Sequence, residues 1–288
     1  YGDMSSRVMS ILSKQSPAIE IYSIDEAFLD FTGISDGENY ALDMRKKVKQ
    51  YTGIPVSIGL AHTKTLSKVA NYMAKRYTSN GVYSLIDDKE IESTLKEFPV
   101  SKLWGIGRRY SIKLSKQGIC SAYDFMQLDE KWILKEMSIT GLKILRELQN
   151  EKCYDIDVNP VYKKNICTSR SFGREIESLG DLKQSVSTYA IRCAEKLRMQ
   201  KSCAAYISVF IHTNPFRANQ RQYNGYKCVR FDYPTNDNYD LVKSAMYLLD
   251  SIYHKDYRYK RAGVIVGGML LESQIQLDLF DWDIDMNE

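Results

Sequence analysis

The sequence predicts an α+β protein of more than one domain, and three observations support this prediction. The chain has 288 residues, of which 44% are hydrophobic and 26% charged, a composition typical of globular proteins, and about 100–200 residues usually make one domain. Strand and helix patterns alternate in the first third of the chain, and short helices with glycine breaks follow. Strand and helix patterns then recur in the order β-α-β-β-α-β. We therefore expect an α/β part, an all-α part and a second α+β part.

The first part, residues 1–97, begins its regular pattern at residues 19–31. This segment is rich in β-branched and aromatic residues and is interrupted by Asp25 and Glu26, so it predicts extended chain with a break. The other expected elements are a helix over 40–51, a strand over 56–61 and a helix over 64–75 with Thr63 as its N-cap. Lys64 and Lys68 are expected to lie on the solvated face of that last helix.

The second part, residues 98–156, predicts short helices joined by the turn Trp104-Gly105-Ile106-Gly107, which Arg108 and Arg109 follow at once. Glycines let the backbone approach a phosphate group closely, and a helix N-terminus aims its N–H groups at the phosphate. A lone G-x-G is more often only a tight turn. Residues 157–165, which include Pro160, are the predicted linker.

The third part, residues 166–271, has the element order of a ferredoxin-like fold. The expected elements are strands over 166–172, 204–212, 227–231 and 262–269 and helices over 182–199 and 239–253. Ile207, Val209 and Ile211 alternate with polar and aromatic residues, so one face of the sheet should pack on the helices. The other face should remain open.

Charge is distributed unevenly along the chain. Residues 272–288 contain six acids and no Lys or Arg, whereas residues 160–230 contain 13 Lys and Arg against four Asp and Glu. A basic surface of this kind binds a polyanion by releasing counterions, although a solvated basic face is the simpler interpretation. Nucleic acid is therefore the leading candidate partner.

Composition and motifs argue against several classes of protein. The longest apolar run, residues 262–271, has ten residues and three glycines, whereas a membrane helix needs about 20 apolar residues. The six cysteines form no C-x-x-C pair, which favours reduced thiols in the cytoplasm over disulfides or a zinc site. Zinc-hydrolase, acyl-transfer and Walker-type nucleotide motifs do not occur in the sequence.

The adjacent acids Asp25 and Glu26 are the strongest chemical signal. Carboxylates inside an apolar segment need a cationic partner, and on a straight strand they would point to opposite faces. We therefore place them at a tight turn between two short strands. Their oxygens suit Mg²⁺, and two such ions would activate a hydroxyl and stabilise a leaving pyrophosphate. A surface turn that merely carries two acids is the alternative.

The segment YSIDEAFLDF, residues 22–31, resembles the palm signature of Y-family translesion DNA polymerases. Further segments point to the bacterial UmuC-type branch of this family, and they occur in the same order along nearly the whole chain: residues 59–75, 100–109, 167–173, 210–216 and 257–264. The resemblance implies a partial palm at 1–97, a helix-hairpin-helix thumb at 98–156 and a little finger at 166–271. The implied activity is error-prone DNA synthesis past damaged bases in the SOS response.

The resemblance also implies roles for individual residues. Asp25 and Glu26 correspond to catalytic ligands of two Mg²⁺ ions, and Lys75 corresponds to a lysine that contacts the triphosphate of the incoming dNTP. The implied contacts with primer-template DNA come from two groups: Gly105, Ile106, Gly107, Arg108 and Arg109 in the hairpin, and Arg170, Arg174, Arg217, Arg221 and Arg230 in the little finger.

The acidic tail, residues 272–288, resembles a tether for a protein partner. The residues that match the short motif by which bacterial polymerases bind the sliding clamp are Gln276, Leu277, Asp278, Leu279 and Phe280. Alternatively, this segment folds back on the little finger. Family membership further implies a UmuD-type accessory protein and a RecA filament as partners.

The sequence departs from the family pattern at its start. The family's first metal-binding aspartate, its aromatic steric gate and its fingers domain should precede Tyr1, so we expect an N-terminally truncated chain. Two alternatives to an active polymerase follow: a catalytically inactive DNA- and clamp-binding fragment, and, with less support, an RNA-binding protein. The aromatic pattern that RNA-binding sheets carry is absent from the sequence.

Overall fold

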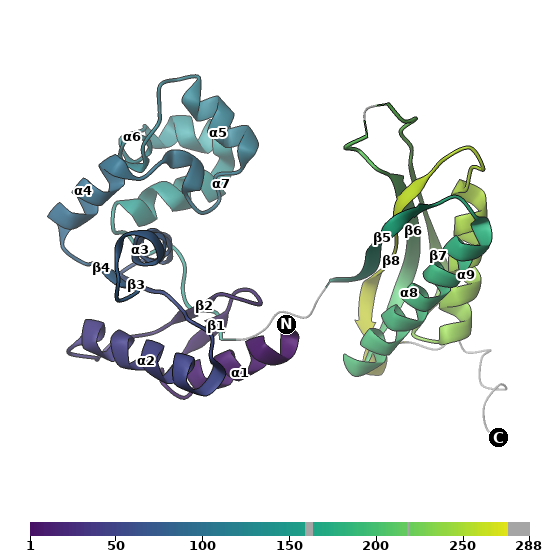
Figure 1. Ribbon diagram of the computed structural model, residues 1–288, viewed down its shortest axis with the longest axis horizontal. Helices are drawn as coiled ribbons and strands as arrows, with labels where there is room; N and C mark the ends of the chain where they lie inside the picture. The colour runs from purple at the N-terminus through teal and green to yellow at the C-terminus, as the bar shows by residue number, and fades with distance from the viewer. Residues whose placement is uncertain (159–163, 218, 276–288) are drawn as a thin grey trace. The chain divides into compact units, whose positions relative to one another are not determined.

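The computed structural model describes residues 1–158, 164–217 and 219–275, and the chain divides into two compact units, Tyr1–Pro160 and Val161–Glu288 (Figure 1). The secondary structure is mixed α and β, as expected. Within these described residues, no helix is long and apolar enough to cross a membrane.

The first unit opens with a helix that the sequence analysis did not predict, α1 (Gly2–Leu12), which buries Val8, Met9 and Leu12. The elements that follow are β1 (Ile19–Ile21), β2 (Ala27–Leu29), α2 (Gly37–Thr52), β3 (Ile58–Ala61), α3 (Lys64–Tyr77), β4 (Val82–Leu85) and α4 (Asp88–Glu97). Strands β1 and β2 are antiparallel, and β3 and β4 form a separate parallel pair. The Thr63 hydroxyl accepts a hydrogen bond from the Leu66 N–H, so the predicted N-cap of α3 is confirmed.

The rest of the first unit is helical, as predicted. Its elements are η1 (Val100–Lys102), α5 (Arg108–Ser115), α6 (Ala122–Met126) and α7 (Glu130–Leu148), which kinks at Ser138. One hydrophobic core runs through both parts of the unit, because Leu66 and Val69 of α3 share it with Ile144 and Leu148 of α7. The all-α part therefore packs directly on the helix that follows β3.

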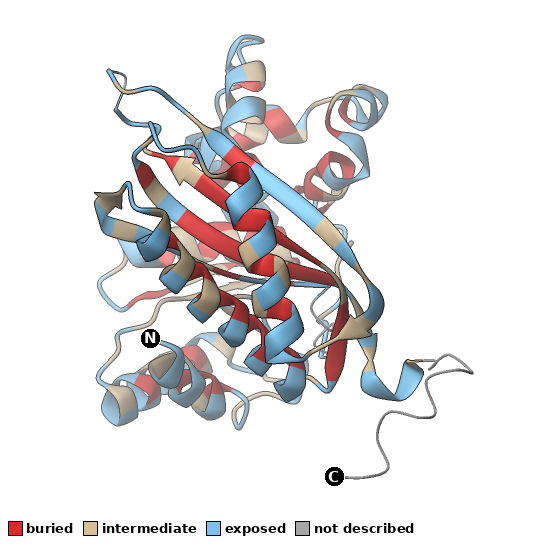
Figure 2. Cartoon of the chain, turned by 90° about the vertical axis from the view of Figure 1, so that its right-hand side faces the viewer, coloured by how far each residue is buried: buried red, intermediate tan, exposed pale blue. Residues whose placement is uncertain are grey.

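The second unit has the predicted element order. Its elements are β5 (Asn165–Ile176), α8 (Leu179–Met199), β6 (Ser202–Thr213), β7 (Asn224–Thr235), α9 (Asn238–Ile252), β8 (Tyr259–Leu271) and η2 (Glu272–Gln274). The strands lie in the order β5-β8-β6-β7, and all neighbours are antiparallel. Both helices cover the same face of this sheet (Figure 1). The outward sides of the helices are exposed, whereas the central strands of the sheet, β6 and β8, carry most of its buried positions (Figure 2).

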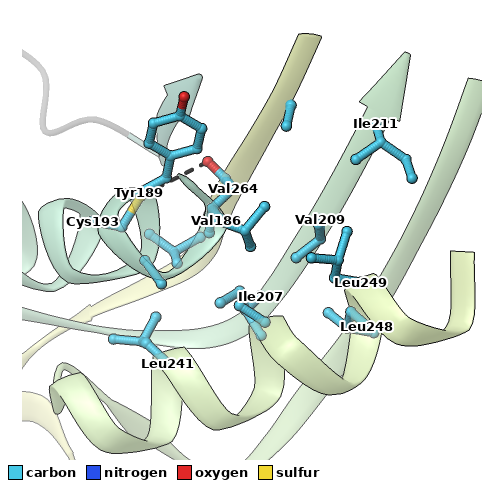
Figure 3. Close-up of a cluster of buried hydrophobic side chains, with 14 of the residues drawn as sticks. Val186, Tyr189, Cys193, Ile207, Val209, Ile211, Leu241, Leu248, Leu249 and Val264 are labelled. Carbon is cyan, nitrogen blue, oxygen red and sulfur yellow. Dashed lines mark hydrogen bonds between the residues drawn. The ribbon is translucent and has the colours of Figure 1, made fainter. Parts of the chain in front are cut away.

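The core of the second unit lies between this sheet and its two helices. Ile207, Val209 and Ile211 of β6 are fully buried, as their alternation predicts. They meet side chains such as Val186 of α8 and Leu248 of α9 (Figure 3). Burying a side chain of this kind contributes about 1.5–3 kcal/mol, so this layer fixes which face of the sheet remains open.

Glycine on β8 shapes the open face of the sheet. Gly263 pairs with Phe210 of β6 and with Ser169 of β5. A Cβ atom at Gly263 would lie 2.4 Å from Phe210 Cζ and 2.5 Å from Ser169 Cβ. The Phe210 ring therefore occupies the space that a side chain at position 263 would need.

Gly263→Ala is expected to destabilise the second unit by about 1–3 kcal/mol, because the added methyl group overpacks against Phe210 and Ser169. Gly173→Ala on β5 is the matched control, since a Cβ there would meet no atom within 4 Å. Urea unfolding followed by circular dichroism measures both. Equal unfolding midpoints for the two variants would contradict this account of the sheet.

Candidate active site and nucleic-acid surface

Asp25 and Glu26 lie in a tight turn between β1 and β2, as predicted. The N–H groups of Tyr22 and Ser23 donate to the Glu26 carbonyl oxygen at 3.1 and 3.0 Å. The Ser23 hydroxyl also donates to Asp25 Oδ1 at 2.7 Å. We refer to residues 22–26 as the carboxylate turn; its local hydrogen bonds fix the backbone that carries the two consecutive acids.

Helix α3 supplies the cations beside this turn, and the expectation that its first lysines are solvated is wrong. Lys68 Nζ lies 2.7 Å from Glu26 Oε2, and its side chain is only 19% exposed. Lys64 forms an ion pair with Glu20 of β1, and its side chain is 10% exposed. The reason is packing: the helix face that carries these lysines is turned towards the β1–β2 hairpin, which could not be read from helical spacing.

Aromatic rings surround the Lys68 ammonium group. Its nitrogen lies 4.5 Å from the ring centroid of Tyr22, 5.6 Å from that of Phe28 and 5.9 Å from that of Trp104. We call Tyr22, Phe28 and Trp104 the aromatic cage. Trp104 Nε1–H donates to the Tyr22 hydroxyl at 2.9 Å, so the glycine turn of the all-α part is tied to the carboxylate turn.

A buried carboxylate fixes the start of α3. Glu147, near the end of α7, is fully buried. Its Oε2 accepts hydrogen bonds from the N–H and the hydroxyl of Thr65, each at 2.8 Å. Its Oε1 accepts from the N–H groups of Cys153 and Tyr154 at 3.2 and 3.1 Å. One side chain thus joins α3, α7 and the chain that follows α7.

Lys75 lies in the last turn of α3 and is exposed. Its spacing of seven residues from Lys68 and eleven from Lys64 places all three lysines on one face of the helix. The helix therefore presents a row of cations that begins beside the carboxylate turn and continues to Lys75.

The predicted hairpin residues have different environments. Gly105 has φ +85°, and a Cβ there would lie 2.5 Å from Ile144 Cδ1, so the turn requires glycine. Ile106 is buried and holds the turn to the core, whereas Arg108 and Arg109 are exposed in the first turn of α5. The free N–H groups at this helix start and the two guanidinium groups suit an anion.

The arginines of the second unit do not form one surface. Arg230 pairs with Tyr206 across the sheet, which places it on the open face, whereas Arg170 pairs with Ala262 of the core and lies on the helix-covered face. Arg217 and Arg221 lie in the β6–β7 connection, where Arg217 forms an ion pair with Glu175 at 3.3 Å. Arg174 is exposed on β5.

Sequence reasoning missed Arg261, whose register opposite His212 places it on the open face of the sheet. Its guanidinium carbon lies 5.7 Å from the Phe210 ring centroid. Burial and the nearby Arg261 charge hold the pKa of His212 below its usual value. His212 therefore contributes a neutral ring at pH 7, and Arg230 and Arg261 contribute the positive charge on this face.

The predicted clamp-binding residues, 276–280, lie outside the described residues. Among the residues that are described, no cluster of three or more His, Cys, Asp or Glu side chains could hold a metal ion. The carboxylate turn carries two acidic side chains that could serve as ion ligands, those of Asp25 and Glu26.

Comparison with known proteins identifies the family. The sequence model of the impB/mucB/samB family matches residues 1–72, and that of its C-terminal domain matches residues 163–279. The chain belongs to the impB/mucB/samB family. Protein UmuC of Salmonella typhimurium is 37% identical over 286 residues, which cover 98% of this chain and 68% of that protein. Protein MucB of Escherichia coli is 33% identical, with 98% of this chain and 67% of that protein covered.

More distant relatives of the chain are named as DNA polymerases. DNA polymerase IV of Treponema denticola is 26% identical, with 97% of this chain and 69% of that protein covered. Among solved structures, a chimeric Y-family DNA polymerase has a TM-score of 0.69 at 21% identity and covers 94% of this chain and 76% of its own. The match to this solved structure shows a shared fold. The UmuC-type relationship that the sequence predicted is confirmed by the family model and by the UmuC relative.

Proposed function

We propose that this chain catalyses template-directed DNA synthesis past damaged bases, as a UmuC-type DNA polymerase. The observation that carries the proposal is the carboxylate turn, in which two consecutive acids, Asp25 and Glu26, are exposed and Glu26 forms an ion pair with Lys68 of α3. Membership of a family whose relatives include proteins named DNA polymerase IV supports the reaction class. The proposed layout is a partial palm at 1–97, a thumb at 98–156, a linker at 157–165 and a little finger at 166–271.

Mg²⁺ fits the donor set of the carboxylate turn. Asp25 and Glu26 offer hard oxygens, and Mg²⁺ commonly takes one or two protein carboxylates and completes its shell with water and substrate phosphates. The Lys68 ammonium beside Glu26 indicates that this position already favours a cation. Two bound ions would supply activation of the primer hydroxyl and stabilisation of the leaving pyrophosphate.

The remaining roles in the proposal concern binding. Lys75, exposed on the lysine face of α3, is proposed to bind the triphosphate of the dNTP. The hairpin at Gly105–Arg109 and the open face that carries Arg230 and Arg261 are proposed to bind the DNA backbone, which positions DNA without reading its sequence. The acidic tail, residues 272–288, includes the proposed clamp-binding segment, residues 276–280. Damaged primer-template DNA, a UmuD-type protein and a RecA filament complete the proposed partners.

A DNA-binding module without synthesis is the second candidate. It is favoured by one observation, namely that the described residues hold no cluster of three potential metal ligands. The first candidate predicts primer extension and the second predicts DNA binding alone, so one assay separates them.

Asp25→Asn and Glu26→Gln are each expected to lower primer extension by about 100-fold or more, because each change removes a metal ligand. Glu38→Gln, in the exposed first turn of α2, is the matched control and should retain the wild-type rate. The assay measures extension of a labelled primer with Mg²⁺ and dNTPs, and circular dichroism checks folding. Wild-type extension by folded Asp25→Asn would refute the metal-site assignment, and binding without extension by the wild type would favour the second candidate.

Affinity for primer-template DNA is expected to fall steeply with salt, since the proposed contacts are to phosphates. Arg230→Gln should reduce the slope of log affinity against log salt by about 1. Arg170→Gln is the control, because register places Arg170 on the opposite face of the same sheet. Fluorescence anisotropy across a salt series measures both slopes. A larger loss of slope in Arg170→Gln than in Arg230→Gln would contradict the proposed surface.

A further inference from the structure

Lys68 is held from two sides, and its side chain is only 19% exposed. On one side Glu26 Oε2 lies 2.7 Å from its nitrogen, and on the other side the Tyr22 ring lies 4.5 Å away. The rings also contact one another: Tyr22 and Trp104 lie 5.6 Å apart edge to face, and Tyr22 and Phe28 lie 5.7 Å apart. The three rings therefore pack on one another without contacts from the Glu26 side chain.

The charges around the carboxylate turn do not balance. Asp25 and Glu26 carry two negative charges on adjacent residues, and Lys68 supplies one positive charge to Glu26. The next lysine on the helix, Lys64, forms its ion pair with Glu20. Asp25 accepts a hydrogen bond from the neutral Ser23 hydroxyl. A divalent ion that binds both carboxylates would supply the missing charge and would take the place that Lys68 occupies at Glu26.

The aromatic cage determines what happens to Lys68 when Glu26 gains another partner. The face of an aromatic ring attracts an ammonium group, most strongly where water is partly excluded. The ammonium therefore does not depend on Glu26 alone to remain in place. Its three N–H donors would then be available beside the ion site.

We propose that Lys68 is a positioning residue that exchanges with a divalent ion at Glu26. Without the ion, Lys68 holds the Glu26 carboxylate in the carboxylate turn. With the ion bound, the cage retains the ammonium, and its N–H groups are directed to an anionic group of the substrate. This inference rests on the proposed function, because it takes Asp25 and Glu26 as ion ligands.

The exchange predicts that loss of the Lys68 charge strengthens ion binding. The probe is Tb³⁺, which binds carboxylate oxygens and whose luminescence is sensitised by nearby Tyr and Trp side chains such as Tyr22 and Trp104. Lys68→Gln should bind Tb³⁺ about tenfold more tightly than the wild type, since one unit charge a few ångströms from the ion is removed at a partly screened site. If Lys68 had only a structural role, its replacement would instead loosen the site and weaken Tb³⁺ binding.

Four further variants make the comparison specific. Lys68→Arg keeps the charge and should keep the wild-type affinity within about twofold, since a guanidinium group also stacks on aromatic rings. Lys96→Gln breaks an equivalent exposed pair with Glu92 on α4 and should leave the affinity unchanged. Glu26→Gln should abolish most of the sensitised signal. Lys68→Met is a second neutral variant that preserves the aliphatic stem and replaces Lys68→Gln if that variant does not fold.

The outcomes separate this inference from the proposed function. Equal or weaker Tb³⁺ binding by folded Lys68→Gln, together with loss of signal in Glu26→Gln, would overturn the exchange and leave the ion site standing. Wild-type signal in Glu26→Gln would show that the carboxylate turn is not the ion site, and the proposed function would fail with it. Tighter binding by the neutral variants Lys68→Gln and Lys68→Met, with unchanged binding by Lys68→Arg and Lys96→Gln, would support the exchange.

Discussion

The burial of one carboxylate, that of Glu147, determines the geometry of the first unit. A buried charge costs several kcal/mol unless donors surround it, and Glu147 lies near the C-terminal end of α7, where the helix dipole disfavours an acid. Four hydrogen bonds compensate for this cost, two of them from Thr65. The N-terminal end of α3 favours negative charge. The dipole of α3 therefore stabilises the Glu147 carboxylate, which the dipole of α7 disfavours.

The position of α3 in turn decides where its cations lie. The Thr63 hydroxyl donates to the Glu147 backbone carbonyl oxygen at 2.8 Å. The backbone and the side chain of Glu147 are therefore both hydrogen-bonded to the start of α3. One turn later Lys68 meets Glu26, and two further turns on Lys75 is exposed on the same face. The α/β part and the all-α part thus act together to bring a lysine row to the carboxylate turn.

The sequence predicted local features well and long-range pairings poorly. The turn at Asp25 and Glu26, the N-cap Thr63 and the element order of the second unit all depend on neighbouring residues, and the structure has them. The partners of Lys64 and Lys68 depend on the packing of a hairpin some forty residues earlier, which periodicity cannot reveal. Glu147 is 82 residues from Thr65, and in the sequence it is one acid of an ordinary helix.

Strand register accounts for the other difference between the expected and the observed site. Arg170 and Arg230 are both exposed arginines in predicted strands, and the family resemblance implied DNA contacts for both. Side chains alternate between the faces of a sheet, so only the pairing of β5 with β8 and of β7 with β6 assigns each to a face. The open face instead combines Arg230 with Arg261, for which the sequence predicted no role.

The most direct test of this account is amide hydrogen exchange at the start of α3, in the wild type and in Glu147→Ala. We expect the Thr65 amide to lose protection by about tenfold or more in Glu147→Ala, because its acceptor is removed. The amides of Tyr22 and Ser23 in the carboxylate turn should exchange faster as well. Glu151→Ala, which changes an exposed acid just beyond the end of α7, should leave both segments unchanged. Wild-type protection of Thr65 and of the carboxylate turn in Glu147→Ala would contradict the claim that this buried carboxylate organises the site.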